Sequence, residues 1–197
     1  MPGAFEVSLE ETFELDSLRT AEEIQRCGAE ILVWLEQLAG LDDPPQIDVA
    51  FVREVHYRWF ATTFPADAGR ERTGMVRNRK QTAAPVEAIL PGIDQACGNW
   101  KWRHDNYWPA DALEEIRFIV SEANCLAVAL YDVHPFVDGN TRTTWHMRNY
   151  ALMRDGLRPL IDVGNEDVYD AVWVAASALD HRDLDDLVLA ELAREDE

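Results

Sequence analysis

The stretch VHPFVDGNTRTTWHMRN, residues 133–149, separates two segments with helical spacing and concentrates reactive side chains within a few positions. Pro135 disfavours helical geometry at the preceding residue, so we expect His134 to leave the helix before it and to lie on a loop. Gly139 permits a tight turn, after which the next helix is predicted to begin at about Asn140. The crowded loop is therefore predicted to join two central helices.

Apolar residues recur at helical spacing on both sides of this loop. The segment before the loop predicts a buried helix through residue 130 with Pro109 in its first turn, and the segment after it predicts a helix over residues 140–156. Other helices are predicted at residues 20–40, 48–64, from Pro91 onward, 167–179 and 183–194. Residues 74–84 lack this period and predict a hairpin or an irregular ribbon. The expected fold is mainly α, a helical bundle with a short β-hairpin flap.

Composition limits the kind of protein. A chain of 197 residues that is 47% hydrophobic can bury a core as one domain, residues 1–197, without disulfides or structural metal. A formal net charge of −19 disfavours non-specific binding to nucleic acid or to an anionic membrane. Three well-separated cysteines predict reduced thiols. The first residues lack a basic and apolar signal peptide, and no segment is long enough to span a membrane, so a cytoplasmic protein is expected.

The groups on the loop suit chemistry at phosphorus. The N–H groups that begin the next helix can form an anion cradle, with donors expected from Gly139, Asn140, Thr141 and Arg142. Asp138 would repel a polyanion unless Mg²⁺ bridges its carboxylate to phosphate oxygens, while the Arg142 side chain can bind another phosphoryl group. His134, with an unperturbed pKa of about 6.5, can accept a proton from an attacking hydroxyl. The predicted reaction is transfer of a phosphorus-containing group, with His134 as base and Asp138 as metal ligand.

These residues resemble the signature of the Fic (filamentation induced by cyclic AMP) family, HxFx(D/E)GNGRxxR. The matching positions are His134, Phe136, Asp138, Gly139, Asn140 and Arg142, with Thr141 and Trp145 at two positions that differ. Asn149, the sequence LMRDGLRP after the motif, and YRWFATTFPADAGRER before it also match the family's pattern. The resemblance extends over about residues 51–159, which is most of the chain.

The resemblance implies a Fic core, at about residues 48–160, that transfers AMP from ATP to a Ser, Thr or Tyr hydroxyl of a target protein. It implies that His134 is the base, that Asp138 binds Mg²⁺, and that Phe136 anchors the loop in the core. The anion site would comprise Gly139, Asn140, Thr141 and Arg142. The flap would pair with an extended target segment by strand addition, through Thr73, Gly74, Met75, Val76 and Arg77.

Two departures from the family pattern leave the transferred group open. Thr141 replaces the second glycine, and Trp145 replaces the second arginine, which in the family clasps the γ-phosphate. An inhibitory (S/T)xxxE(G/N) helix, whose glutamate pairs with that arginine, is not found in the chain, so regulation is either absent or supplied by a separate antitoxin or regulator. AMP transfer leads, and UMP transfer, Doc-like phosphorylation, phosphocholine transfer and a non-catalytic binding role remain open.

Three other features have less specific interpretations. Basic residues at 70, 72, 77, 79 and 80 predict a solvated face, or alternatively a flap that attracts an acidic or phosphorylated target. The aromatic run NWKWRHDNYW, residues 99–108, predicts a loop packed across helices rather than a base-stacking surface. His146 could contact the nucleotide but is expected to be a packing residue, and His56 and His181 are expected to be structural.

Overall fold

The computed structural model describes residues 21–62, 65–78, 81–160 and 181–194, and within these the protein is a bundle of α-helices. The helices are α2 (Ala21–Ala39), α3 (Val49–Phe60), α4 (Ile89–Asn106), α5 (Ala112–Val133), α6 (Asn140–Arg154) and α8 (Arg182–Leu192), and a short 3₁₀ helix, η1 (Val86–Ala88), precedes α4. The prediction of a mainly α fold is confirmed. The helix expected at residues 167–179 lies outside the described residues.

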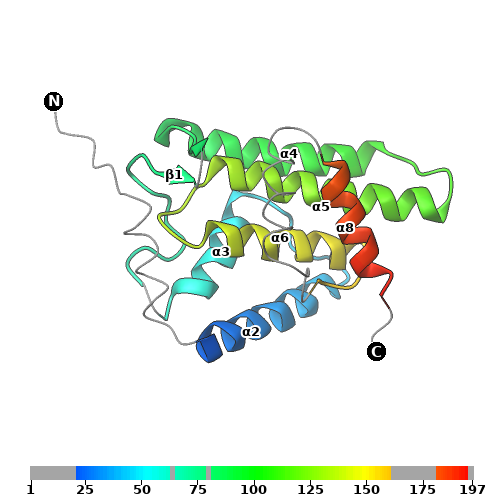
Figure 1. Cartoon of the computed structure of the whole chain (residues 1–197), viewed down its shortest axis with the longest axis horizontal. Coiled ribbons are helices and arrows are strands. Elements are labelled where there is room, and N and C mark those ends of the chain that lie inside the picture. The colour runs from blue at the N-terminus through cyan, green and yellow to red at the C-terminus, as the bar shows by residue number, and fades with distance from the viewer. Residues whose placement is uncertain (1–20, 63–64, 79–80, 161–180, 195–197) are drawn as a thin grey trace.

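The bundle is organised around α6. Helices α4 and α5 run side by side, α5 packs along α6, and α2 and α3 cover the other side of α6 (Figure 1). Helix α8 crosses α5 at the end of the bundle away from β1. Because neighbours enclose α6, most of its side chains are buried, including the polar ones of Thr143, Asn149 and Arg148.

Aspartates begin two of the helices. The Asp48 carboxylate accepts a hydrogen bond from the Phe51 N–H at 2.8 Å and caps α3, and Asp111 caps α5 by accepting from the Glu114 N–H at 2.8 Å. Pro91 lies in the first turn of α4 as expected. The expectation for Pro109 is wrong, because Asp111 supplies the capping oxygen and the helix therefore begins at Ala112, three residues after the proline.

The aromatic run at residues 99–108 also differs from the expectation of a loop. Residues up to Asn106 continue α4, with Trp100 buried against the core and Trp102 66% exposed. Polar side chains one turn apart support this end of the helix, since Lys101 pairs with Asp105 at 2.7 Å. Aromatic residues therefore lie on both the buried and the exposed side of this helix end, and the His104 ring packs on that of Trp100 with centroids 4.1 Å apart.

The β element lies where it was expected. Strand β1 (Arg77–Asn78) pairs antiparallel with β2 (Gln81–Thr82), in the register Arg77 to Thr82 and Asn78 to Gln81. The Ala83 N–H donates to the Val76 carbonyl at 3.1 Å and extends the pairing toward the base of the ribbon. Strand β1 lies beside the ends of α5 and α6 that face the connecting loop (Figure 1).

Two further expectations concern cysteines and membranes. Cys27, Cys97 and Cys125 are free thiols, and burial, together with Asp48 and Asp94, raises the pKa of Cys97 to about 12. None of the helices in the described part of the chain combines the length and the apolar character needed to cross a bilayer.

Candidate active site

His134 is the C-cap of α5 and lies outside the right-handed helical geometry that Pro135 disfavours. Its backbone lies in the left-handed region, with φ 49° and ψ 62°, and its N–H donates to the Leu130 carbonyl at 3.1 Å. A non-glycine residue in this region costs about 1–3 kcal/mol, so surrounding contacts must hold it there. Residues 135–139, with a bend at residues 136–138, then lead from His134 to the start of α6.

The His134 imidazole is neutral at physiological pH. Burial and, to a smaller extent, the nearby positive charge of Arg72 lower its pKa to about 4, against the opposite effect of the Tyr131 backbone carbonyl. A neutral imidazole can accept a proton, as a general base must. The charge of an incoming polyphosphate would oppose both lowering effects and make the imidazole more basic.

Gly139 is the N-cap of α6 and cannot be replaced without strain. Its φ is +74°, and a Cβ atom here would lie 1.9 Å from Cε2 of Phe60. Its N–H donates to the Asp138 carboxylate at 2.6 Å, so this amide does not face outward as the sequence suggested. Because glycine has no side chain to cap the helix, the amides of Asn140, Thr141 and Arg142 are the donors that the positive end of α6 offers to an anion.

Gly139→Ala is expected to destabilise the protein by at least about 3 kcal/mol, because left-handed strain adds to overpacking against Phe60. Urea unfolding followed by circular dichroism measures the change. Gly98→Ala is the matched control: Gly98 lies inside α4 and its added methyl would meet nothing within 4 Å, so this variant should be as stable as the parent or slightly more stable. Equal stability of the two variants would contradict the assigned packing.

Asn140 holds the loop closed through its side chain. Its Oδ1 accepts from the Phe136 N–H and its Nδ2 donates to the Phe136 carbonyl, both at 2.9 Å. Both polar ends of the amide are therefore used inside the protein, and the residue is buried. Only the backbone of Asn140 is placed to contribute to an anion site.

His56 supports the same loop from α3, a contact that the sequence did not indicate. Its ring stacks on Phe136 with centroids 3.8 Å apart, and Phe136 is fully buried. Nδ1 accepts from the Gly69 N–H at 2.8 Å, so Nε2 carries the proton and donates to the Asp138 carbonyl at 3.0 Å. Burial lowers the pKa of His56 to about 4, against the effects of the Asp138 carbonyl and Glu71, so the neutral ring keeps both contacts.

The remaining motif positions lie along α6. Thr141 is exposed, and the Arg142 guanidinium carbon lies 5.5 Å from the centre of the Trp59 ring. His146, one turn later, is buried with its ring 5.3 Å from that of Trp59, which agrees with the expected packing role. Trp145, which replaces the family's second arginine, packs against the core.

The predicted flap residues precede and begin β1. Thr73 is exposed, Gly74 and Met75 are half-buried, and Arg77 is the first residue of the strand. Val76 is 6% exposed, so its side chain is turned toward the protein. Arg72 was grouped with a solvated basic face, and this was wrong: it is 2% exposed, because its guanidinium is surrounded by backbone carbonyl groups. Arg72 is the last residue of AGRER, which belongs to the upstream segment that matches the family's pattern. This match was the sequence signal that could have singled out Arg72 from the other basic residues.

A metal at this site would depend on one carboxylate. Among the described residues, no group of three or more His, Cys, Asp or Glu side chains is arranged to hold an ion. Asp138 directly precedes the N-cap of α6, and Mg²⁺ is commonly bound by one or two carboxylates together with substrate phosphates. The residues present therefore fit a cation held jointly by Asp138 and the phosphates of a nucleotide.

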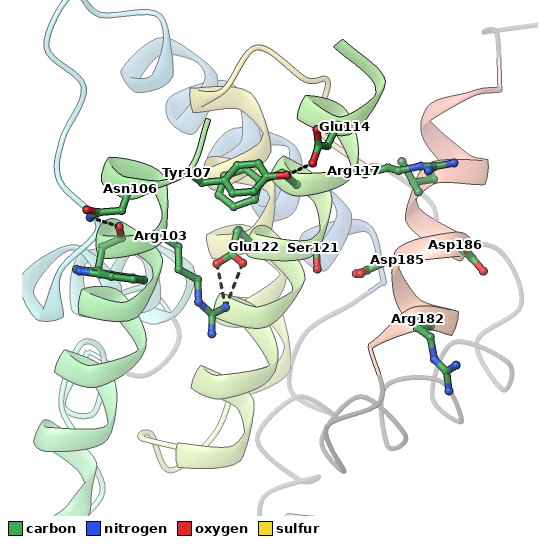
Figure 2. Close-up of a pocket in the computed structure, with 13 residues that line it drawn as sticks. Arg103, Asn106, Tyr107, Glu114, Arg117, Ser121, Glu122, Arg182, Asp185 and Asp186 are labelled. Atoms are coloured by element: carbon green, nitrogen blue, oxygen red, sulfur yellow. Dashed lines mark hydrogen bonds and ion pairs between the residues drawn. The ribbon is translucent and has the colours of Figure 1, made fainter. Parts of the chain in front are cut away.

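A separate cavity lies elsewhere in the bundle. It has a volume of about 710 Å³ and is lined by residues of α4, α5 and α8 (Figure 2). Arg103 contacts both carboxylate oxygens of Glu122 at 3.1 Å, and Tyr107 donates to Glu114. Glu114 precedes His134 by twenty residues of α5, or about 30 Å of helix. This cavity is therefore not part of the motif site.

Comparison with known proteins was consistent with the geometry of the loop. The sequence model of the Fic/DOC family matches residues 46–152, which is more than half of the chain. The chain is 32% identical over 120 residues to "Protein adenylyltransferase fic-1" of Caenorhabditis briggsae, a match that covers 59% of this chain and 21% of that protein. The chain thus spans about a fifth of the length of the curated relatives it matches.

Solved structures show the same fold. Fic-1 from Caenorhabditis elegans superposes with a TM-score of 0.68 at 24% identity, over 84% of this chain and 47% of that one. BepC from Bartonella tribocorum, solved with bound AMPPNP, gives a TM-score of 0.65 at 14% identity, over 97% of this chain and 94% of the other. With the motif, the helical core and the family match in agreement, the chain belongs to the Fic/DOC family.

Proposed function

We propose that this protein transfers AMP from ATP–Mg²⁺ to a hydroxyl group of a target protein. The observation that carries the proposal is the juxtaposition of a neutral His134 at the end of α5 with the glycine-capped amino end of α6, joined by residues 135–139. One group can accept a proton and the other can hold negative charge. The adenylyltransferase name of the relatives supports AMP as the transferred group.

The proposed reaction uses few groups of the chain. His134 accepts the proton of the target hydroxyl as its oxygen attacks the α-phosphorus, and the bond to the leaving pyrophosphate breaks. The amides of residues 140–142 and the charge of Arg142 bind phosphate oxygens. Asp138 would hold Mg²⁺, which when bound neutralises phosphate charge. His56 and Asn140 keep the loop in place during the reaction.

A second candidate, transfer of the γ-phosphate, is favoured by Trp145 at the position where the family pattern has its second arginine. Without that arginine, the orientation of the triphosphate is less constrained. The two candidates differ in which phosphorus atom becomes attached to the acceptor.

Labelled ATP separates the candidates. The protein is incubated with Mg²⁺, a cell lysate and ATP labelled at either the α- or the γ-phosphorus, and labelled proteins are resolved by electrophoresis. The proposal predicts protein labelling from α-labelled ATP only. Labelling from the γ position alone would replace it with phosphorylation, and labelling from neither position would contradict transfer to protein.

A further inference from the structure

Arg72 carries a buried charge that is satisfied by backbone oxygen atoms. Arg72 is 2% exposed, and burial lowers the pKa of its guanidinium. A buried cation is costly unless its N–H groups are all used. The five N–H donors of an arginine are fixed in a planar fork, which suits simultaneous contact with several carbonyl groups.

One side of this fork holds the end of α5. Arg72 Nε donates to the His134 carbonyl at 2.7 Å, and Nη2 donates to the Val133 carbonyl at 3.3 Å. The backbone N–H of Arg72 donates to the Pro135 carbonyl at 2.9 Å. These carbonyls lie at the negative end of a helix of 22 residues, where a cation is favoured. Arg72 thus contacts three consecutive residues centred on His134.

The other side of the fork holds both ends of the β1–β2 ribbon. Nη1 donates to the Gly74 carbonyl at 2.7 Å, three residues before β1, and Nη2 donates to the Ala84 carbonyl, two residues after β2. The hydrogen bond from Ala83 to Val76 lies just inside these contacts. One side chain therefore closes the base of the ribbon and joins it to the backbone of His134.

We propose that Arg72 is a positioning residue that sets the ribbon at a fixed distance and orientation from the His134 imidazole, so that a protein segment bound along the ribbon presents its hydroxyl to that base. This inference rests on the proposed function. The inference explains how the acceptor protein is aligned with His134. Arg72 itself contacts neither the nucleotide nor the acceptor in this proposal. Lysine keeps the charge but not the planar fork, so it cannot reproduce the ties to both ends of the ribbon.

Two substitutions separate the effect of the guanidinium hydrogen bonds from the effect of the positive charge. Arg72→Lys keeps a cation and loses the fork, and Arg72→Gln loses both. Arg70→Gln is the matched control, because Arg70 lies two residues away in the same segment and is exposed. If Arg72 had only a general structural role, the two variants would not differ in the pKa of His134, which is one of the readouts described next.

The first readouts need no substrate. Amide hydrogen exchange of Ala83 should become at least about tenfold faster in both Arg72 variants, since each lost charge-assisted hydrogen bond contributes a factor of this order. NMR titration of His134 should show a higher pKa in Arg72→Gln than in the parent, with Arg72→Lys close to the parent. Parent-like exchange of Ala83 in Arg72→Lys would overturn the proposal.

The catalytic readout compares two acceptors. With α-labelled ATP, the ratio of labelled protein to AMP released to water should fall about tenfold in Arg72→Lys, because water needs no alignment along the ribbon. An unchanged ratio would also overturn the proposal. If the parent protein labels nothing, the proposed function fails, whereas hydrogen exchange and the His134 titration still decide the role of Arg72.

A measurement on the parent protein covers the case in which both variants fail to fold. Arg72 is buried and its Nε–H donates to the His134 carbonyl, so the NMR signal of this group should exchange with water far more slowly than that of exposed Arg70. Equally fast exchange of the two signals would show that the fork is not held, and would overturn the proposal.

Discussion

Replacing His134 by alanine is expected to lower the rate of AMP transfer by about 10²–10⁴-fold, the usual contribution of a general base. The loss should appear in the turnover rate at saturating ATP rather than in nucleotide affinity, because the imidazole acts on the acceptor hydroxyl. Initial rates of labelling from α-labelled ATP measure the first quantity, and calorimetric titration with a non-hydrolysable ATP analogue measures the second.

A second substitution separates the loss of the base from backbone strain. Asparagine tolerates the left-handed conformation of position 134 better than alanine does, and it offers no comparable base. His134→Asn should therefore be as inactive as His134→Ala while unfolding at a higher urea concentration. His104→Gln, on the distant part of α4, is the control for a histidine change outside the site and should retain activity. Full activity of His134→Asn would reject the assigned base.

Three buried histidines are expected together to reduce the free energy of unfolding by about 6 kcal/mol when the pH is lowered from 7 to 5. Burial lowers the pKa values of His56, His134 and His146 to about 4 in the folded protein, against about 6.5 in the unfolded chain. Between these values the unfolded chain binds more protons, so stability falls as the pH falls. By pH 5 each histidine contributes a loss of about 2 kcal/mol, at 1.36 kcal/mol per pH unit.

Urea unfolding at a series of pH values tests this expectation. His146→Leu should reduce the loss between pH 7 and pH 5 by about one third, whatever its effect at pH 7. His104 is the control of opposite sign: burial lowers its pKa, but the hydrogen bond and charge of Asp155 outweigh this and raise it. Removing His104 should therefore make the acid loss larger. Stability that is constant between pH 7 and pH 5 would contradict the neutral, buried state of these rings.

Local chemistry made part of the site predictable from the sequence. Pro135 and Gly139 constrain the backbone at known positions, and these constraints place His134 at a helix end and begin α6 after a left-handed residue. Helices α2 and α3 were predictable for the same reason, since their apolar residues have a helical period and their ends have clear signals. Such features depend on neighbours in the chain.

The residues that the sequence did not reveal act over long separations. Arg72 and His56 contact backbone atoms of the motif loop more than sixty residues away. Because any residue type has a backbone carbonyl, the identity of the accepting residue does not indicate such a contact. Asn140 was expected to offer its backbone N–H to an anion, but the sequence did not reveal that both ends of its side chain hold Phe136. The aromatic run was misread because its aromatic side chains lie on both the buried and the exposed side of α4, so the sequence there shows no single apolar face.

The enclosure of α6 has a consequence for when the protein can act. A helix with polar groups such as Thr143, Arg148 and Asn149 on its buried faces has no apolar stripe with which to fold alone, and it depends on α2, α3 and α5 for its form. A partly folded chain on the ribosome therefore has the motif but no oriented row of amides. The proposed activity toward nucleotide should therefore require the completed tertiary structure.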